Sequence, residues 1–358
     1  MPEKLMEQAM NEGIQALRKT GESRFDDTGE GKCTERGRLG TNGCILSGIG
    51  KPKSEFRLNE KPRGSFLQSG KGEDLDCIFS IDVEDWFHIL DLASTPELEQ
   101  WDALPSHVER DFMHLLDILD ENQVRITCFF LGWIGRKFPH LVQEAVKRGH
   151  EVASHGYAHR LVFRMTRDEF FRDALDSRKI LEDSSGAHVC GYRSSGFSVT
   201  ESTPWVYEGI AQAGYEYDSS VFPAARAHGG MDTPRLAPYR IVGDGWTLTE
   251  FPITVANLLG KKTCFFGGGY LRLFPYPIIH MMAEKVLRDD RPVIFYVHPR
   301  EIEPGHPRLQ MNMVRRFKSY YNLTSTEPKV RRILHDFKFT TFHQYQMEHD
   351  KAFGVAHV

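Results

Sequence analysis

The stretch CIFSIDVEDWF, residues 77–87, is the starting point for predicting the fold. It opens with a short run of apolar and β-branched residues, which is typical of a buried strand. Three acidic side chains, Asp82, Glu84 and Asp85, stand at the end of that run. The stretch therefore predicts a buried strand that carries carboxylates to its C-terminal end.

Strands and helices alternate after this stretch. Further strands are predicted within 125–135, 150–156 and 188–199, and amphipathic helices over 107–124, 139–150, 166–186 and 203–214. Such alternation forms βα units and a parallel sheet. More than four units over about 220 residues predict an α/β fold, a closed or nearly closed barrel with its site at the strand C-termini.

The C-terminal part of this region is less regular. It predicts a hairpin within 234–255, a helix over 277–290, a strand over 291–301, a helix near 327–337 and a short strand over 339–345.

Composition separates the chain into parts. Twelve of the 31 glycines precede residue 73, among charges of both signs and few large apolar residues. Such a segment buries too little surface to offset its ordering entropy. We therefore expect residues 1–72 to be a mobile extension, 73–345 to be the barrel, with its motifs in 77–300, and 346–358 to be a C-terminal tail.

Charge and hydropathy exclude several classes of protein. A net charge of −4 and a pI near 6.5 argue against a nucleic-acid partner, which needs a concentrated basic surface. The sequence shows no apolar run of membrane-spanning length and no ordinary secretory signal. Its six cysteines form no CxxC pair and read as reduced, mostly buried thiols. We expect a cytoplasmic protein, and leave a homo-oligomer open.

Three strand ends carry residues suited to metal or acid–base chemistry. They hold the acids after residue 81, the pair His155 and His159, and His298 after the apolar run VIFYV. One carboxylate and two histidines form a facial ligand set that leaves coordination positions open. A spare carboxylate and a further histidine then serve as base and acid. The combination predicts metal-assisted hydrolysis of an amide or ester.

Each of these features also has a plain structural interpretation when it is taken alone. Acids are common at helix N-termini, and an HxxxH pair arises by chance in a chain with 16 histidines. Arg193 and Asp218, which follow two other strands, could each belong to a structural ion pair. Trp86 could line a sugar subsite or belong to the core.

Five motifs, taken in order, make the sequence resemble a known superfamily. FSIDVEDWFH, SHGYAH, YRSSGF, YDSS and FYVHPRE are similar to the motifs of the polysaccharide deacetylase (NodB-homology, carbohydrate esterase 4) superfamily, from about residue 77 to residue 300. The strings EFPIT, GGGYLRLFPY and YVHPREIEPGHPRL further resemble the subfamily found beside bacterial exopolysaccharide loci.

The resemblance implies a distorted (β/α) barrel with one divalent metal ion, usually zinc and sometimes cobalt or nickel. It implies hydrolysis of the N-acetyl group of an amino sugar, with His155 and His159 as metal ligands. Asp82 would be the general base, held by Arg193. His298 would be the general acid, oriented by Asp218.

The sequence departs from the family pattern at the first motif. The family has two adjacent acids there, of which the second binds the metal, whereas Val83 follows Asp82 here. In an extended strand Glu84 shares a face with Asp82, which favours Glu84 as the third ligand. If the chain turns at Val83, Asp85 takes that place, and both alternatives stay open.

Two rival functions of the barrel remain, beside a third in which the extension over residues 1–72 is the main functional element and tethers the barrel to a partner. The first is an amidohydrolase of a small cyclic or linear amide, as some members of the superfamily are. The second is a non-catalytic glycan-binding relative. The presence of Asp82, Arg193, Asp218 and His298 together argues against the second, because binding alone requires neither an acid nor a base.

Overall fold

The structure, a computed structural model, describes residues 77–224, 229–258 and 260–357. The predicted extension over 1–72 lies outside these residues. One sheet of ten strands runs through the described part, in the order β10-β1-β2-β3-β4-β5-β7-β6-β12, with β11 paired to β1. The strands are β1 (Cys77–Val83), β2 (Thr127–Phe130), β3 (Glu151–Ser154), β4 (Gly191–Tyr192), β5 (Tyr217–Asp218), β6 (Tyr239–Val242), β7 (Thr247–Glu250), β10 (Ile294–Val297), β11 (Phe339–Thr340) and β12 (Gly354–His357).

The sheet is parallel from β10 to β7, and only the β6–β7 pair is antiparallel among its described strands. Strand β1 lies inside it, with Ile81 opposite Val297 of β10 and Cys128 of β2. All seven residues of β1 are buried, which explains its nearly continuous apolar sequence. The predicted α/β class and the predicted hairpin within 234–255 are confirmed.

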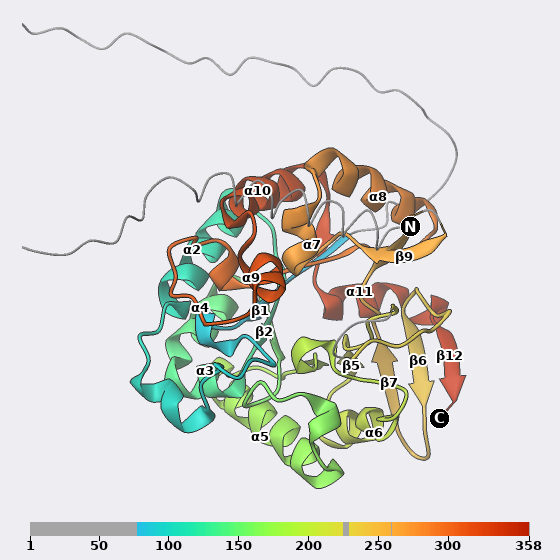
Figure 1. The fold of residues 1–358 in the computed structure, drawn as a ribbon. Helices are drawn as coiled ribbons and strands as arrows, with labels where there is room; N and C mark the ends of the chain where they lie inside the picture. The colour runs from blue at the N-terminus through green and yellow to red at the C-terminus, as the bar shows by residue number, and fades with distance from the viewer. Residues whose placement is uncertain (1–76, 225–228, 259, 358) are drawn as a thin grey trace, which may run out of the picture. The chain divides into compact units, whose positions relative to one another are not determined.

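Helices cover the sheet. They are α2 (Val108–Glu121), α3 (Gly132–Lys137), α4 (Pro139–Lys147), α5 (Arg167–Ser185), α6 (Trp205–Gln212), α7 (Gly268–Leu273), α8 (Tyr276–Arg288), α9 (Met313–Tyr320), α10 (Thr326–Asp336) and α11 (Phe342–His349). Helices α2 to α5 lie together on one side of the molecule, and β6, β7 and β12 lie on the other (Figure 1). A separate hairpin joins β8 (Val255–Leu258) to β9 (Lys261–Cys264).

Four segments differ from the prediction. The strand predicted within 188–199 is limited to Gly191–Tyr192, and the 3-10 turn η4 (Ser195–Phe197) follows it. The strand predicted to reach residue 135 ends at Phe130, and α3 begins at Gly132. Only Phe339 and Thr340 of the final predicted strand pair with β1, and α11 begins at Phe342. The residues predicted as a tail complete α11 and form β12 beside β6.

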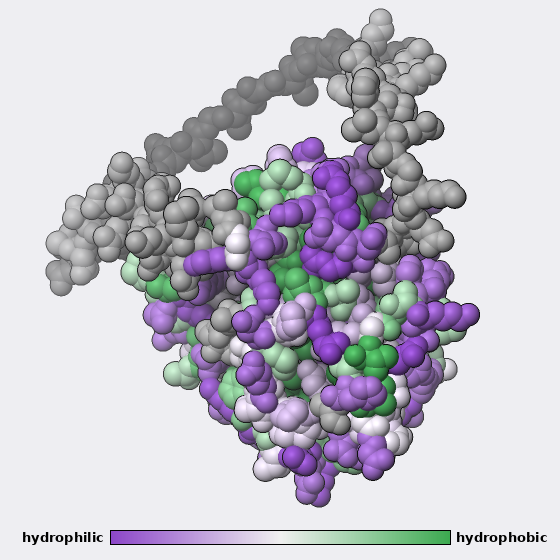
Figure 2. Space-filling model, turned by 90° about the vertical axis from the view of Figure 1, so that its right-hand side faces the viewer, coloured by the Kyte–Doolittle hydropathy of each residue, from purple (hydrophilic) through white to green (hydrophobic). Residues whose placement is uncertain are grey.

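The surface on the side of β6 and β12 is largely hydrophilic, interrupted by hydrophobic patches (Figure 2). Within the described ranges, no helix has the length and apolar character that a membrane span requires.

Parallel strands place the predicted site residues at one edge of the sheet. Asp82 lies near the C-terminal end of β1, and His155 directly follows β3. Arg193 follows β4, and His298 follows β10. The four segments come from strands within the same continuous run of the sheet, so their side chains meet in space.

Candidate functional site

Glu84, His155 and His159 form the centre of the site. Their ligand atoms all lie within 4.8 Å of one another, and all three side chains are buried. Glu84 Oε1 lies 3.3 Å from His155 Nε2 and 2.9 Å from His159 Nε2. A carboxylate and two imidazoles so arranged form a candidate site for a zinc-type ion with open coordination positions.

A backbone hydrogen bond orients His155 in a way that suits a ligand. His155 Nδ1 lies 2.8 Å from the carbonyl oxygen of Arg193. That carbonyl accepts the Nδ1–H, so Nε2 presents its lone pair to the centre. His159 has a backbone φ of 51°, a left-handed conformation that non-glycine residues adopt at a cost.

The nitrogens of His159 test whether an ion fits. Nε2 lies 2.9 Å from Glu84 Oε1, yet neither ring nitrogen makes a hydrogen bond of acceptable geometry with any described residue. Buried polar atoms rarely stay unpaired. Two ligand atoms that both point to a shared metal position come close to each other without forming an aligned hydrogen bond. The contact between Glu84 Oε1 and His159 Nε2 has this form, so the donor set fits a metal ion.

Charged neighbours keep Glu84 ionised. Burial alone would raise the pKa of its carboxyl group, but His159, Arg300 and His298 hold the pKa well below its usual range. Arg300 donates from Nη1 to Glu84 Oε2, the oxygen that does not face the histidines. Glu84 therefore offers Oε1 as a negatively charged ligand at neutral pH.

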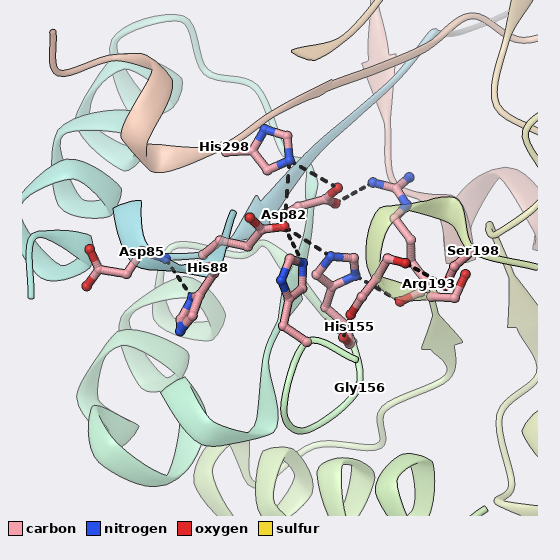
Figure 3. Close-up of polar contacts among 12 residues, drawn as sticks. Asp82, Asp85, His88, His155, Gly156, Arg193, Ser198 and His298 are labelled. Atoms are coloured by element: carbon pink, nitrogen blue, oxygen red, sulfur yellow. Dashed lines mark hydrogen bonds and ion pairs between the residues drawn. The ribbon is translucent and has the colours of Figure 1, made fainter. Parts of the chain in front are cut away.

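Asp85 does not join this cluster. Its side chain accepts hydrogen bonds from the backbone N–H of Trp86, from the Ser106 hydroxyl and from the backbone N–H of His107. It thereby caps the turn η1 (Trp86–His88) and points away from His155 (Figure 3). Of the two alternatives for the third ligand, the geometry favours Glu84.

Asp82 lies beside the cluster and is held by Arg193. Arg193 Nη1 lies 2.5 Å from Asp82 Oδ1 and 2.9 Å from the Ser80 hydroxyl. The guanidinium is fully buried, with its carbon 4.0 Å from the ring centre of Phe129. One oxygen of Asp82 is thus fixed, and the other, Oδ2, faces His298 at 3.9 Å.

His298 approaches the same point from β10 (Figure 3). Its Nε2 lies 3.9 Å from Asp82 Oδ2 and 3.7 Å from Glu84 Oε1. Its Nδ1 lies 3.0 Å from Glu301 Oε2. Burial lowers the pKa of His298, but Glu84 and Glu301 outweigh this and raise it. The imidazole therefore keeps a proton more readily than a free histidine does.

The predicted contact between Asp218 and His298 is wrong. Glu301, in the turn that follows β10, takes that place. The Asp218 carboxylate instead accepts from the Ser220 hydroxyl at 2.5 Å and neighbours the carboxyl group of Glu250, which lies opposite it on β7. Asp218 is therefore part of a buried carboxyl pair.

Trp86 does not contribute a sugar surface. It is 7% exposed within the main hydrophobic cluster, and its indole N–H donates to the carbonyl oxygen of Pro105 at 2.9 Å. The prediction that it binds substrate is contradicted by this burial. A groove of about 740 Å³ opens instead beside His159, and Leu90, Trp101, Arg160 and Arg164 contribute to its lining.

Sequence reasoning missed Glu301 and Arg300. Glu301 accepts from both the backbone N–H and the ring of His298, which is the pattern of a capping box. The spacing H-x-x-E was a usable signal for it. Arg300 gave no such signal, because its contact with Glu84 spans 216 positions of the chain.

Comparisons with known proteins agree with this geometry. The polysaccharide deacetylase family model matches residues 100–217, which include His155, His159 and Arg193. The chain contains a polysaccharide deacetylase domain. A second model, described as a domain of unknown function (DUF3473), matches residues 219–347.

Two peptidoglycan-N-acetylglucosamine deacetylases of Bacillus cereus resemble part of the chain. One is 31% identical over 72 residues, which are 20% of this chain and 26% of the relative. The other is 29% identical over 68 residues, 19% of this chain and 32% of the relative. The chain thus spans only about a quarter to a third of the length of the curated relatives it matches.

Solved structures support the fold of the deacetylase domain. A Mycobacterium smegmatis protein assigned as a polysaccharide deacetylase has a TM-score of 0.53 at 17% identity, covering 81% of this chain and 96% of that one. PuuE allantoinase has a TM-score of 0.50 at 13% identity, covering 77% and 90%. At these identities the likeness concerns the fold alone, and the predicted barrel-type α/β fold is confirmed.

Proposed function

We propose that the chain is a metal-dependent hydrolase that removes the N-acetyl group from an amino sugar in a polysaccharide or its precursor. The observation that carries this proposal is the convergence of a ligand set, a held carboxylate and a held imidazole on one point. Glu84, His155 and His159 would hold the ion, with zinc as the first candidate and cobalt or nickel as alternatives. Such an ion supplies Lewis acidity, which acidifies water and polarises a carbonyl oxygen.

Asp82 is the proposed general base. Arg193 occupies Oδ1, so the proton of the attacking water would pass to Oδ2, the oxygen that faces His298 and the ligand cluster. The pairing holds Asp82 in one orientation, which is the preparation that a base requires.

His298 is the proposed general acid. Glu301 fixes Nδ1, so Nε2 is the nitrogen that would donate a proton to the leaving amine. Raising the pKa of His298 favours the protonated form that an acid needs before the bond breaks.

The groove beside His159 supports a sugar chain as substrate. It is open to solvent and carries polar and apolar side chains, among them Leu92 and Arg160. A small amide would be held in a closed pocket, whereas neighbouring sugars of a polymer need an open groove. The subfamily strings support a place in exopolysaccharide metabolism, with cytoplasmic residence as part of the proposal.

Activity of a variant series tests the assignment. We expect acetate release from N-acetylglucosamine oligomers to fall about 10²–10⁴-fold in His298→Ala, with metal content unchanged. His155→Ala should lose metal and activity together. His335→Ala, at a side chain that is 82% exposed, is the matched control. Full activity of His298→Ala would overturn the assignment, and metal binding without acetate release from any variant would redirect the search to small amides.

A further inference from the structure

A second group of ligand side chains lies at the opposite edge of the sheet. His188 and Cys190 precede β4, and Glu216 precedes β5. These two strands are parallel neighbours, so the group sits at their amino ends. Asp82, His155 and His298 stand at the carboxyl ends, and the two groups share no residue.

The spacing of this group matches tetrahedral coordination. His188 Nε2 lies 3.3 Å from Glu216 Oε1, and Cys190 Sγ lies 3.6 Å from the same oxygen. Zinc bonds of about 2.0–2.1 Å to nitrogen, about 2.1 Å to oxygen and about 2.3 Å to sulfur give edges of about 3.4 Å for N···O and about 3.6 Å for S···O at tetrahedral angles. Both distances to Glu216 Oε1 therefore agree with a shared ion, and all three ligand atoms lie within 4.8 Å of one another.

Glu182 prepares His188 for such an ion. Its Oε1 lies 2.9 Å from His188 Nδ1 and accepts the Nδ1–H in the tautomer that binds a metal through Nε2, while Arg178 Nη2 lies 3.1 Å from the same nitrogen. The lone pair of Nε2 is then directed to Cys190 and Glu216, as in carboxylate–histidine–zinc arrangements. Glu182 stands in the last turn of α5, whose C-terminal end favours a cation.

The net negative charge of the group balances the charge of a divalent cation. Arg178 lies 3.1 Å from Glu182 Oε1 and offsets that carboxylate. Glu216 and a Cys190 thiolate leave two negative charges. Burial raises the pKa of the Cys190 thiol to about 12, so the metal-free protein holds a thiol. Binding would form a metal–sulfur bond and release the thiol proton to solvent.

We propose that His188, Cys190 and Glu216 form a second site for a zinc-type divalent cation, remote from the deacetylase centre. The mixed nitrogen, sulfur and oxygen ligands suit zinc rather than calcium or magnesium, which take oxygen ligands. The ion would tie the end of α5 to the amino ends of β4 and β5. This inference is independent of the proposed function.

Cobalt substitution distinguishes the two sites. The full chain is stripped with a chelator and titrated with Co²⁺, and the near-ultraviolet thiolate-to-cobalt charge-transfer band is recorded. The deacetylase centre offers no sulfur, so the band reports a cysteine ligand alone. We expect the band in the wild type and in His155→Ala, and its loss in Cys190→Ser and His188→Gln.

Zinc titration against a chromophoric chelator supplies the second readout. The wild type should bind one more equivalent of zinc than Cys190→Ser. Glu216→Gln should lower the zinc affinity of that second site at least about tenfold. Glu201→Gln, at an exposed carboxylate, is the control. Acetate release should be unchanged in Cys190→Ser and His188→Gln. Absence of the band in the wild type, or its persistence in both variants, would overturn the proposal.

Discussion

Glu84 joins the proposed ion-binding and acid–base parts of the site. One of its oxygens faces His155 and His159, and the other accepts from Arg300. A carboxylate with one oxygen occupied in this way is restricted to binding an ion through the other. Arg300 thus fixes the mode in which Glu84 binds.

Glu301 is a positioning residue for His298, and two substitutions test this. Glu301→Leu removes the acceptor of the Nδ1–H, so we expect kcat to fall on the order of 10²-fold through misplacement of the imidazole. Glu301→Gln keeps an acceptor for the Nδ1–H and should recover most of that loss. KM and metal content should be unchanged in both variants, as measured by steady-state kinetics and metal analysis. An unchanged kcat in folded Glu301→Leu, as judged by circular dichroism, would contradict the role.

Residue-level reasoning succeeded where a strand end fixed the direction of a side chain. Asp82 and Arg193 stand on neighbouring parts of the sheet edge, and they pair as the motif implied. It failed for Asp218, because a buried carboxyl group pairs with whatever lies opposite it. Glu250 was that neighbour, and only the register of β5 against β7 reveals it.

The helices and strands show what an apolar pattern can specify. The run over 125–135 is equally compatible with a strand and with a short buried helix, so α3 was missed. In FTTFHQY the aromatic and β-branched residues favoured a strand. The cap at Thr341, whose hydroxyl accepts from the N–H of Gln344, started α11 instead.

Helix α5 depends on its N-terminal cap. The Thr166 hydroxyl accepts from the N–H of Glu169, and the Glu169 carboxylate accepts from the N–H of Thr166. We expect Thr166→Ala to lower the free energy of unfolding by about 1 kcal/mol, measured by urea denaturation. Thr324→Ala, at an exposed threonine in the turn η6 (Leu323–Ser325), is the control. Equal effects of the two substitutions would contradict this role of the cap.

Strands β5 and β7 bring Asp218 and Glu250 together in the interior. Burial raises the pKa of Asp218 to about 6, and burial with the neighbouring Asp218 raises that of Glu250 well above its usual range. Because both native pKa values are raised, the contribution of Asp218 to stability is complete below about pH 4 and is lost as pH rises through about 6, and that of Glu250 is lost as pH rises through its own raised pKa. The pair holds β5 and β7 together best when it carries a proton.

Glu250→Gln tests this pH dependence. The amide can still donate to Asp218 but cannot ionise, so we expect the variant to lose less stability than the wild type between about pH 5 and pH 9. Urea midpoints at both pH values measure the difference, with Glu201→Gln as the control. If the stability of the variant changed with pH as much as that of the wild type, the pair would not titrate in this range.

At the scale of the whole molecule, the order of motifs was enough to predict the architecture. A parallel sheet brings the carboxyl ends of its strands to one edge, so residues as distant in sequence as Asp82 and His298 meet. Side chains outside the motifs were not predictable in this way. The group at His188, Cys190 and Glu216 depends on the same sheet order at the opposite edge, where the sequence has no motif.

Metal content paired with acetate release tests the central claim most directly. The purified wild type should hold one more equivalent of zinc than His155→Ala, and its acetate release from N-acetylglucosamine oligomers should stop on chelation and return with zinc. Because both proteins retain Cys190, zinc bound at the second site cancels in the comparison. Equal zinc content in both, or acetate release that survives complete removal of metal, would contradict a metal-dependent deacetylase built on Glu84, His155 and His159.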